Sequence, residues 1–167
     1  MENKPKRIIW HHSADTTKTP QASKIDAYHK SKNFPVSALG YYGGYHVLIE
    51  RDGSRFRYRG DTETGAHDKD ENIDTLGVCL AGNFDIELPT ENQKMSLARL
   101  LEEWTIIWSI PKENIEPHRL HDTTSCPGTK LYNDWAKEIL NDLPTAGIKN
   151  TIIKILEKAI QDIHAAR

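Results

Sequence analysis

The sequence predicts an α/β domain, because segments typical of buried strands alternate along the chain with segments typical of amphipathic helices. Short apolar runs at 7–10 and 77–82 have the composition of buried strands. After Thr90, apolar residues recur at three- and four-residue steps over about five turns, which indicates a long helix with one packed face. Two strands of a hairpin lie between these elements.

The first strand, "RIIW" (7–10), is followed by a helix. Thr19 and Pro20 provide an N-cap and a first-turn signal, and the helix is expected to run to about Lys32. Its inner face is expected to carry Ile25, Tyr28 and His29.

A β-hairpin is expected next, formed by "YHVLIE" and "RFRYR". The Asp52-Gly53 pair between these segments supplies the positive φ that a tight turn needs. The run "GVCLAG" (77–82) is continuously apolar and bounded by glycines, which is typical of a central strand. Cys79 lies inside this run, so we interpret it as a core residue.

The long helix after Thr90 is the strongest signal in the chain. Its apolar positions are Met95, Leu97, Ala98, Leu101, Trp104, Ile107 and Trp108. A turn-rich polar segment, "RLHDTTSCPGTK" (119–130), comes later, and "LYNDWAKEIL" (131–140) then predicts a short helix.

Residues 1–143 are long enough for one domain with its own core, whereas 144–167 read as a linker followed by a C-terminal amphipathic helix. Pro and Gly interrupt the pattern at 141–147. The stripe of the final helix consists of Ile148, Ile152, Ile155, Ala159 and Ile163. Two roles remain open for this helix: packing on the domain, or self-association through the isoleucines.

Composition excludes several classes of function. The formal net charge is −2, so the chain has no basic footprint for nucleic acid. No stretch approaches the ~18 apolar residues of a membrane span, and the N-terminus lacks the apolar region of a signal peptide. We therefore expect synthesis in the cytoplasm, and reduced thiols at Cys79 and Cys126.

Five residues at strand ends and in loops can bind a metal or move a proton: His11, Tyr45, His67, His118 and Cys126. A catalytic zinc site needs three N, O or S ligands and one open position, which His11, His118 and Cys126 could supply. Simpler interpretations remain for each. The His11-His12 pair could cap a strand end, His118 could face solvent, and Cys126 could be a small apolar residue in a turn. The spacing in the sequence does not show that His11 lies near His118 and Cys126, because that depends on the fold.

Four blocks of the sequence carry a resemblance to a known family. They are "IIWHHSAD", "GGYHVLIERDG", "TGAHDKDENIDTLGVCLAGNF" and "PHRLHDTTSCPGTKLY", and they span most of residues 6–140. In this order they resemble the zinc-dependent N-acetylmuramoyl-L-alanine amidases. This family includes small phage endolysins and the peptidoglycan recognition proteins. The resemblance implies a mixed central β-sheet flanked by α-helices, and bacterial peptidoglycan as the partner.

The resemblance also implies a role for individual residues. It makes His11, His118 and Cys126 the ligands of Zn²⁺, places Tyr45 beside the metal, and gives His12 and His67 positions in the substrate groove. Thr124 takes the position that a catalytic lysine holds in some phage enzymes, so a hydroxyl donor replaces a cation there.

Three hypotheses follow from these residues. The favoured one is a peptidoglycan hydrolase that cleaves the bond between N-acetylmuramic acid and L-alanine, as an endolysin that reaches the cell wall after release from the cytoplasm. The alternative is a non-catalytic peptidoglycan-binding module of the same fold; family members of that kind commonly lack the cysteine. A structural zinc domain fits poorly, because three candidate ligands leave one position open.

Overall fold

A computed structural model describes residues 3–143 of the chain. The described residues form a five-stranded sheet with the strand order β3-β2-β4-β1-β5. The strands are β1 (Arg7–His12), β2 (Val47–Ile49), β3 (Arg55–Arg57), β4 (Thr75–Leu80) and β5 (Ile115–Pro117). β1 pairs in parallel with β4 and β5, β2 pairs in parallel with β4, and β3 is antiparallel to β2. The sheet is therefore mixed, as expected.

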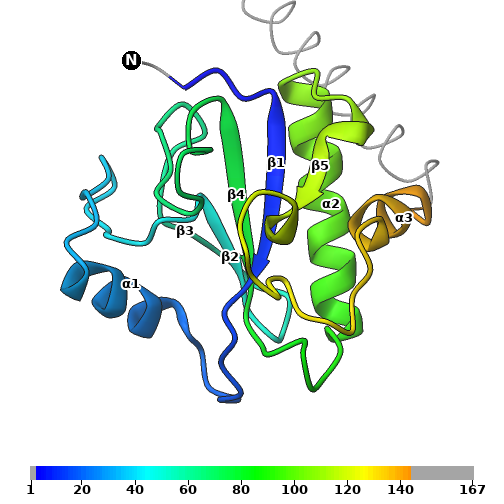
Figure 1. Cartoon of the computed structure of the whole chain (residues 1–167), viewed down its shortest axis with the longest axis horizontal. Coiled ribbons are helices and arrows are strands. Elements are labelled where there is room, and N and C mark those ends of the chain that lie inside the picture. Colours follow the sequence, from blue (N-terminus) through cyan, green and yellow to red (C-terminus); the bar gives the residue numbers. More distant parts are fainter. Residues whose placement is uncertain (1–2, 144–167) are drawn as a thin grey trace, which may run out of the picture.

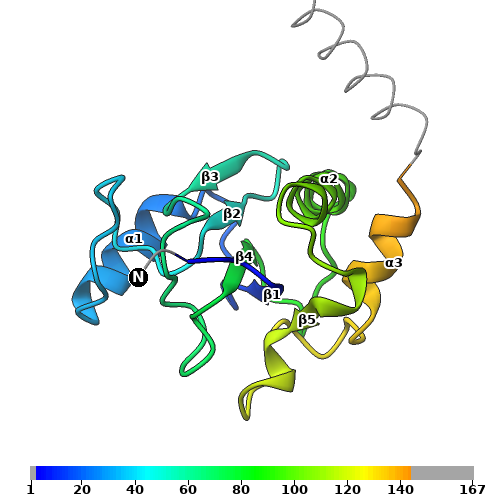
Figure 2. The ribbon, with the colours of Figure 1, turned by 90° about the horizontal axis from the view of Figure 1, so that it is seen from above.

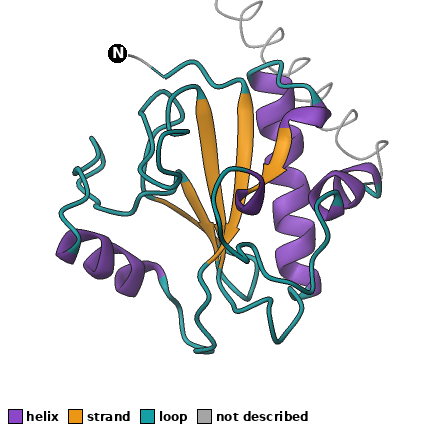
Figure 3. Ribbon diagram, in the orientation of Figure 1, coloured by secondary structure: helices purple, strands orange, loops and turns teal. Residues whose placement is uncertain are grey.

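Helices lie on both sides of this sheet (Figure 1). The helices are α1 (Ala22–Ser31), α2 (Glu91–Ile107) and α3 (Trp135–Asn141), with short 3₁₀ turns η1 (Lys112–Asn114) and η2 (His118–Leu120) before and after β5. Seen from above in Figure 2, α2 and α3 cover one side of the sheet, while α1 lies on the other. Long loops join the elements on the α1 side, as Figure 3 shows.

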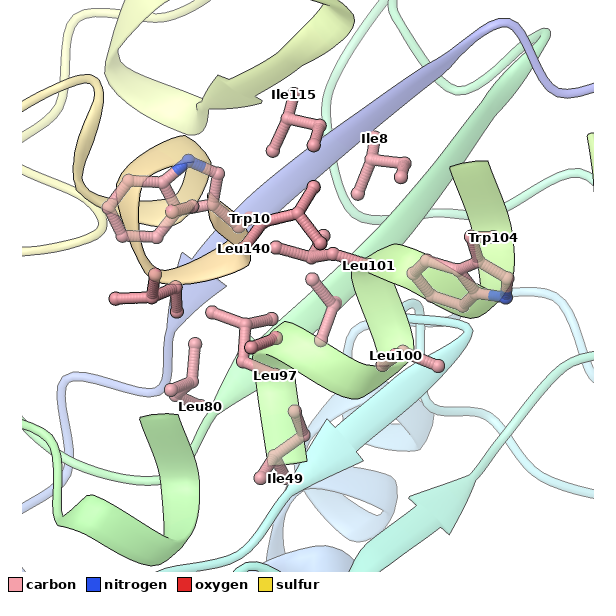
Figure 4. Close-up of a cluster of buried hydrophobic side chains, with 14 of the residues drawn as sticks. Ile8, Trp10, Ile49, Leu80, Leu97, Leu100, Leu101, Trp104, Ile115 and Leu140 are labelled. Atoms are coloured by element: carbon pink, nitrogen blue, oxygen red, sulfur yellow. The ribbon is translucent and has the colours of Figure 1, made fainter. Parts of the chain in front are cut away.

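The main core fills the space between the sheet and the pair α2 and α3. Figure 4 shows Ile8 and Trp10 of β1 interleaved with Leu97 and Leu101 of α2 and with Leu140 of α3. Because side chains alternate along a strand, the opposite sheet face carries a smaller cluster. It consists of Leu48, Tyr58, Cys79 and Ala81. Cys79 is fully buried, which confirms it as a core residue.

The helix after Thr90 is confirmed, and a capping box begins it. Thr90 Oγ1 accepts a hydrogen bond from Gln93 N, and Gln93 Oε1 accepts one from Thr90 N, both at 3.1 Å. The expected inner face is only partly right, because Met95 and Ile107 are 45% and 65% exposed. The sheet covers one stripe of α2, and these two residues lie outside it.

The first helix is confirmed and ends near Lys32 as expected, but its start and part of its inner face differ from the expectation. It begins at Ala22 rather than near Pro20, because Glu50 Oε1 accepts hydrogen bonds from Gln21 N and Ala22 N and so caps the helix from beyond β2. Tyr28 is 59% exposed instead of facing inward, whereas His29 is buried as expected.

The short strand β5 was not expected from the sequence, although the residue that follows it, His118, belongs to the candidate site.

The hairpin of β2 and β3 is confirmed, with Gly53 at φ +86° in its turn. Within residues 3–143, no helix combines the length and the apolar character needed to cross a membrane. The C-terminal helix expected within 144–167 lies outside the described residues.

Candidate active site

The parallel register of β1 and β5 brings two histidines together. Trp10 pairs with Pro117, so His11 and His118, the next residues of the two segments, are neighbours at the carboxyl ends of the strands. Their ring centroids are 4.5 Å apart. In α/β sheets this edge is the usual place for a ligand site, because loops from several strands meet there.

Cys126 reaches the same point from the loop between η2 and α3. Arg119 N donates a hydrogen bond to Cys126 O at 2.9 Å, which closes the loop on itself. Asp85, from the loop after β4, accepts hydrogen bonds from Thr129 N at 2.8 Å and from Ser125 Oγ at 3.2 Å. These contacts place Cys126 Sγ 3.8 Å from His11 Nδ1.

The three residues form a group that could hold a metal ion. His11, His118 and Cys126 each offer a ligand atom, and the three atoms lie within 4.8 Å of one another. Two imidazole nitrogens and one sulfur on a tetrahedral zinc would be about 3.5 Å apart, given bonds of about 2.0–2.3 Å. The donor set and its spacing therefore fit a zinc site with one open position.

Burial sets the protonation of this group. It lowers the pKa of His11 well below its usual value, helped by the nearby His67, and it lowers the pKa of His118. Both rings are therefore held neutral, which is the form that binds metals. Burial also raises the pKa of the Cys126 thiol to about 12. A bound cation reverses that effect, since it deprotonates a coordinating thiol.

Tyr45 and Thr124, the two expected catalytic residues, each contact one member of this group. The Tyr45 ring centroid is 5.2 Å from that of His11, and burial raises the pKa of the phenol, so the hydroxyl stays protonated and can donate. Thr124 is exposed, and its Oγ1 accepts a hydrogen bond from Cys126 N at 3.1 Å. Its hydroxyl proton is thus available to a further acceptor.

The two residues expected in the substrate groove are both buried. His12 is 6% exposed, and its Nδ1 accepts a hydrogen bond from Phe84 N at 3.1 Å on the side of the sheet opposite His11. His67 is 9% exposed, and its Nδ1 lies 3.2 Å from His11 Nε2. Their contact with substrate stays a prediction.

Sequence reasoning missed two acidic residues that support the site, Asp68 and Asp85. Asp68 Oδ1 is 3.5 Å from His118 Nε2, and the Asp68 side chain is fully buried. Asp85 holds the Cys126 loop, as described above. Asp68 directly follows His67 in "GAHD", which was a weak signal, but Asp85 contacts residues about 40 positions away and gave none.

The fold and the site together define a mixed α/β domain with a His-His-Cys group at the carboxyl ends of its strands. A family model described as N-acetylmuramoyl-L-alanine amidase matches residues 1–129. The chain belongs to this family.

Similar proteins agree with this family membership. Over 128 residues the chain is 29% identical to peptidoglycan-recognition protein SC2 of Drosophila melanogaster, covering 75% of this chain and 70% of that protein. It is 32% identical over 108 residues to the endolysin of Escherichia phage T7, covering 62% and 68%.

Among solved structures, the amidase LysC from Clostridium intestinale URNW superposes with a TM-score of 0.69. The two sequences are 32% identical, and the match covers 84% of this chain and 86% of that one. The predicted family, the fold class and the enzyme class, a peptidoglycan-hydrolysing amidase, are confirmed.

Proposed function

We propose that this chain uses a zinc ion held by His11, His118 and Cys126 to cleave the bond between N-acetylmuramic acid and L-alanine in bacterial peptidoglycan. The approach of the three ligand atoms to within 4.8 Å of one another carries the proposal. Zinc with three protein ligands supplies a Lewis acid for the scissile carbonyl and lowers the pKa of a water to about 7.

Besides holding the metal, the protein contributes hydrogen-bond donors to the reaction. Tyr45, held protonated by burial, is assigned the role of donor to the carbonyl oxygen as negative charge develops on it. Thr124, which contacts the Cys126 backbone, is assigned a similar role, in which its hydroxyl offers a dipole and no charge. Removing one such donor typically lowers the rate by about 10²- to 10³-fold.

The setting of this activity is proposed to be host lysis. Similarity to the phage T7 endolysin supports an enzyme that is made in the cytoplasm and acts on the cell wall after release. The peptidoglycan strand is the only partner that this role requires.

The proposal is tested on isolated cell walls with purified full-length protein. We expect new amino groups of L-alanine to appear, a chelator to abolish their release, and added Zn²⁺ to restore it. Metal analysis should find one zinc per chain. Walls that are bound by the zinc-loaded protein without any release of amino groups would instead support the non-catalytic binding module.

Substitutions separate the metal ligands from the donors. Cys126→Ala should lose both zinc and activity. Cys79 is the other buried cysteine, and Cys79→Ala, the matched control, should keep one zinc per chain. Tyr45→Phe should keep zinc while its turnover falls by about 10²- to 10³-fold. Full activity of Tyr45→Phe would remove its assigned role.

A further inference from the structure

Two consecutive residues, His67 and Asp68, contact the two candidate imidazole ligands. His67 Nδ1 lies 3.2 Å from His11 Nε2, and Asp68 Oδ1 lies 3.5 Å from His118 Nε2. Each contact uses Nε2 of a candidate ligand and leaves its Nδ1 as the nitrogen for a metal. His11 turns Nδ1 toward Cys126 Sγ, and the Nε2 of His118 is the atom nearest Asp68.

The protons on these rings can be placed from the contacts. A neutral imidazole carries hydrogen on one nitrogen only, so a His11 that binds metal through Nδ1 must carry it on Nε2. That hydrogen points at His67 Nδ1, which leaves the His67 proton on Nε2. His67 Nε2 is 3.4 Å from Thr75 Oγ1, whose hydroxyl donates to Glu71 O at 2.8 Å. This chain of hydrogen bonds ends on a backbone carbonyl, which can only accept, so the donor and the acceptor of each bond are determined.

The Asp68 carboxylate needs a donor. Its side chain is fully buried, and within residues 3–143 neither carboxylate oxygen has a hydrogen-bond partner of good geometry. A buried acceptor without a partner is costly, because it has lost its hydrogen bonds to water. A proton on His118 Nε2 is the nearest donor to this carboxylate, and it is present when His118 uses Nδ1 for a metal.

The surrounding loop is built to hold this pair. Asn72 Oδ1 accepts hydrogen bonds from both backbone amides, His67 N at 2.8 Å and Asp68 N at 3.1 Å. Gly65 and Gly77 leave the space for the His67 ring, since a Cβ at either position would lie within 2.5 Å of it.

We propose that His67 and Asp68 are positioning residues that fix the tautomer and the orientation of both imidazole ligands, and so raise the affinity of the site for its metal. This inference rests on the proposed zinc site. It gives His67 a role through His11 instead of a contact with substrate. Partners of this kind typically change metal affinity by about 10- to 100-fold.

The test measures zinc affinity of the full chain by competition with a chromogenic chelator. Asn places an acceptor near the position of His Nδ1, whereas Gln places its polar group near Nε2. We expect His67→Asn to bind within about threefold of wild type and His67→Gln to bind about 10- to 100-fold more weakly. Asp68→Ala should weaken binding similarly, and Asp68→Asn, which keeps an acceptor, should recover much of it.

Two further measurements distinguish positioning from general loss of structure. The absorption spectrum of the cobalt-substituted protein should change in His67→Gln and not in His67→Asn, because it reports the geometry of the ligands. Thermal unfolding of the metal-free variants identifies those that are folded. Equal affinities and spectra for folded His67→Asn and His67→Gln would overturn the inference while leaving the zinc site intact. If wild type binds no zinc, or Cys126→Ala binds it equally well, the proposed function and the inference both fail.

Discussion

Replacing Gly77 with alanine should disturb the site from the middle of the sheet. A Cβ at this position would lie 2.3 Å from Cδ2 and 2.4 Å from Cγ of the His67 ring, where an ordinary contact needs at least 3.4 Å. One of the two groups must therefore move by about 1 Å. β4 cannot retreat, because it is hydrogen-bonded to β1 on one side and to β2 on the other. The ring has to shift instead.

The magnitude follows from the crowding. Forcing an extra methyl group into a packed interior typically costs about 1–3 kcal/mol. We expect Gly77→Ala to lose this much free energy of unfolding, measured by urea denaturation of the metal-free protein. A ring displaced by about 1 Å also leaves hydrogen-bond range of His11 Nε2, now at 3.2 Å, so zinc affinity should fall as well.

Gly60→Ala is the matched control, because a Cβ there meets its nearest atom at 3.5 Å. Its stability should stay within about 0.5 kcal/mol of wild type, as is usual for substitutions without a specific contact. If Gly77→Ala were as stable as this control and bound zinc normally, the packing of His67 against β4 would be refuted.

Three further outcomes concern the scaffold and are measured by urea denaturation of the metal-free protein. Thr90→Ala removes the hydroxyl that caps α2 at Gln93 N and should cost about 1 kcal/mol, with an unchanged m-value. Glu50→Gln keeps an acceptor for the first amides of α1 but removes the charge, and should cost about 0.3–1 kcal/mol. Burial lowers the pKa of His29 to about 4, and its Nδ1 accepts a hydrogen bond from Gly44 N. The folded pKa of His29 lies below its unfolded value of about 6.5, so the neutral ring stabilises the folded protein fully above pH 6.5. This contribution to the free energy of unfolding is lost as the pH falls toward 4, and it amounts to at most about 3 kcal/mol. His29→Asn, which keeps an acceptor without titrating, should show a shallower loss between pH 6.5 and 4; an equal loss would contradict this origin.

The elements that were predictable from sequence are those whose signal is local. The Thr90 capping box and the apolar steps after it define α2, and Asp52-Gly53 defines the hairpin turn. The three residues of β5 were missed, because a short edge strand that ends in Pro117 has too few residues for a pattern. The inner face of α1 was partly wrong for a related reason. Periodicity identifies a stripe, but no neighbouring element covers that stripe at Tyr28.

The site was predictable in its chemistry and not in its geometry. His11, His118 and Cys126 were recognisable from residue type and family resemblance, yet their approach depends on the register of Trp10 with Pro117. Gly77 appeared from sequence to bound a strand, whereas the structure places it inside β4 under the His67 ring. Contacts of this kind join residues that are far apart in the chain, so no local pattern announces them.

The three candidate ligands differ in how the fold holds them. His11 lies on a central strand, and His118 follows directly from a strand paired with it, so the sheet fixes both backbones. Cys126 belongs to a loop whose position depends on hydrogen bonds from Arg119 and to Asp85. The sheet therefore fixes the backbone positions of the two imidazoles and the loop closes the set, while ring orientation is left to side-chain contacts. The acceptors next to the two rings, at His67 and Asp68, would therefore matter most for metal binding, because they control the ring orientation that the sheet does not fix.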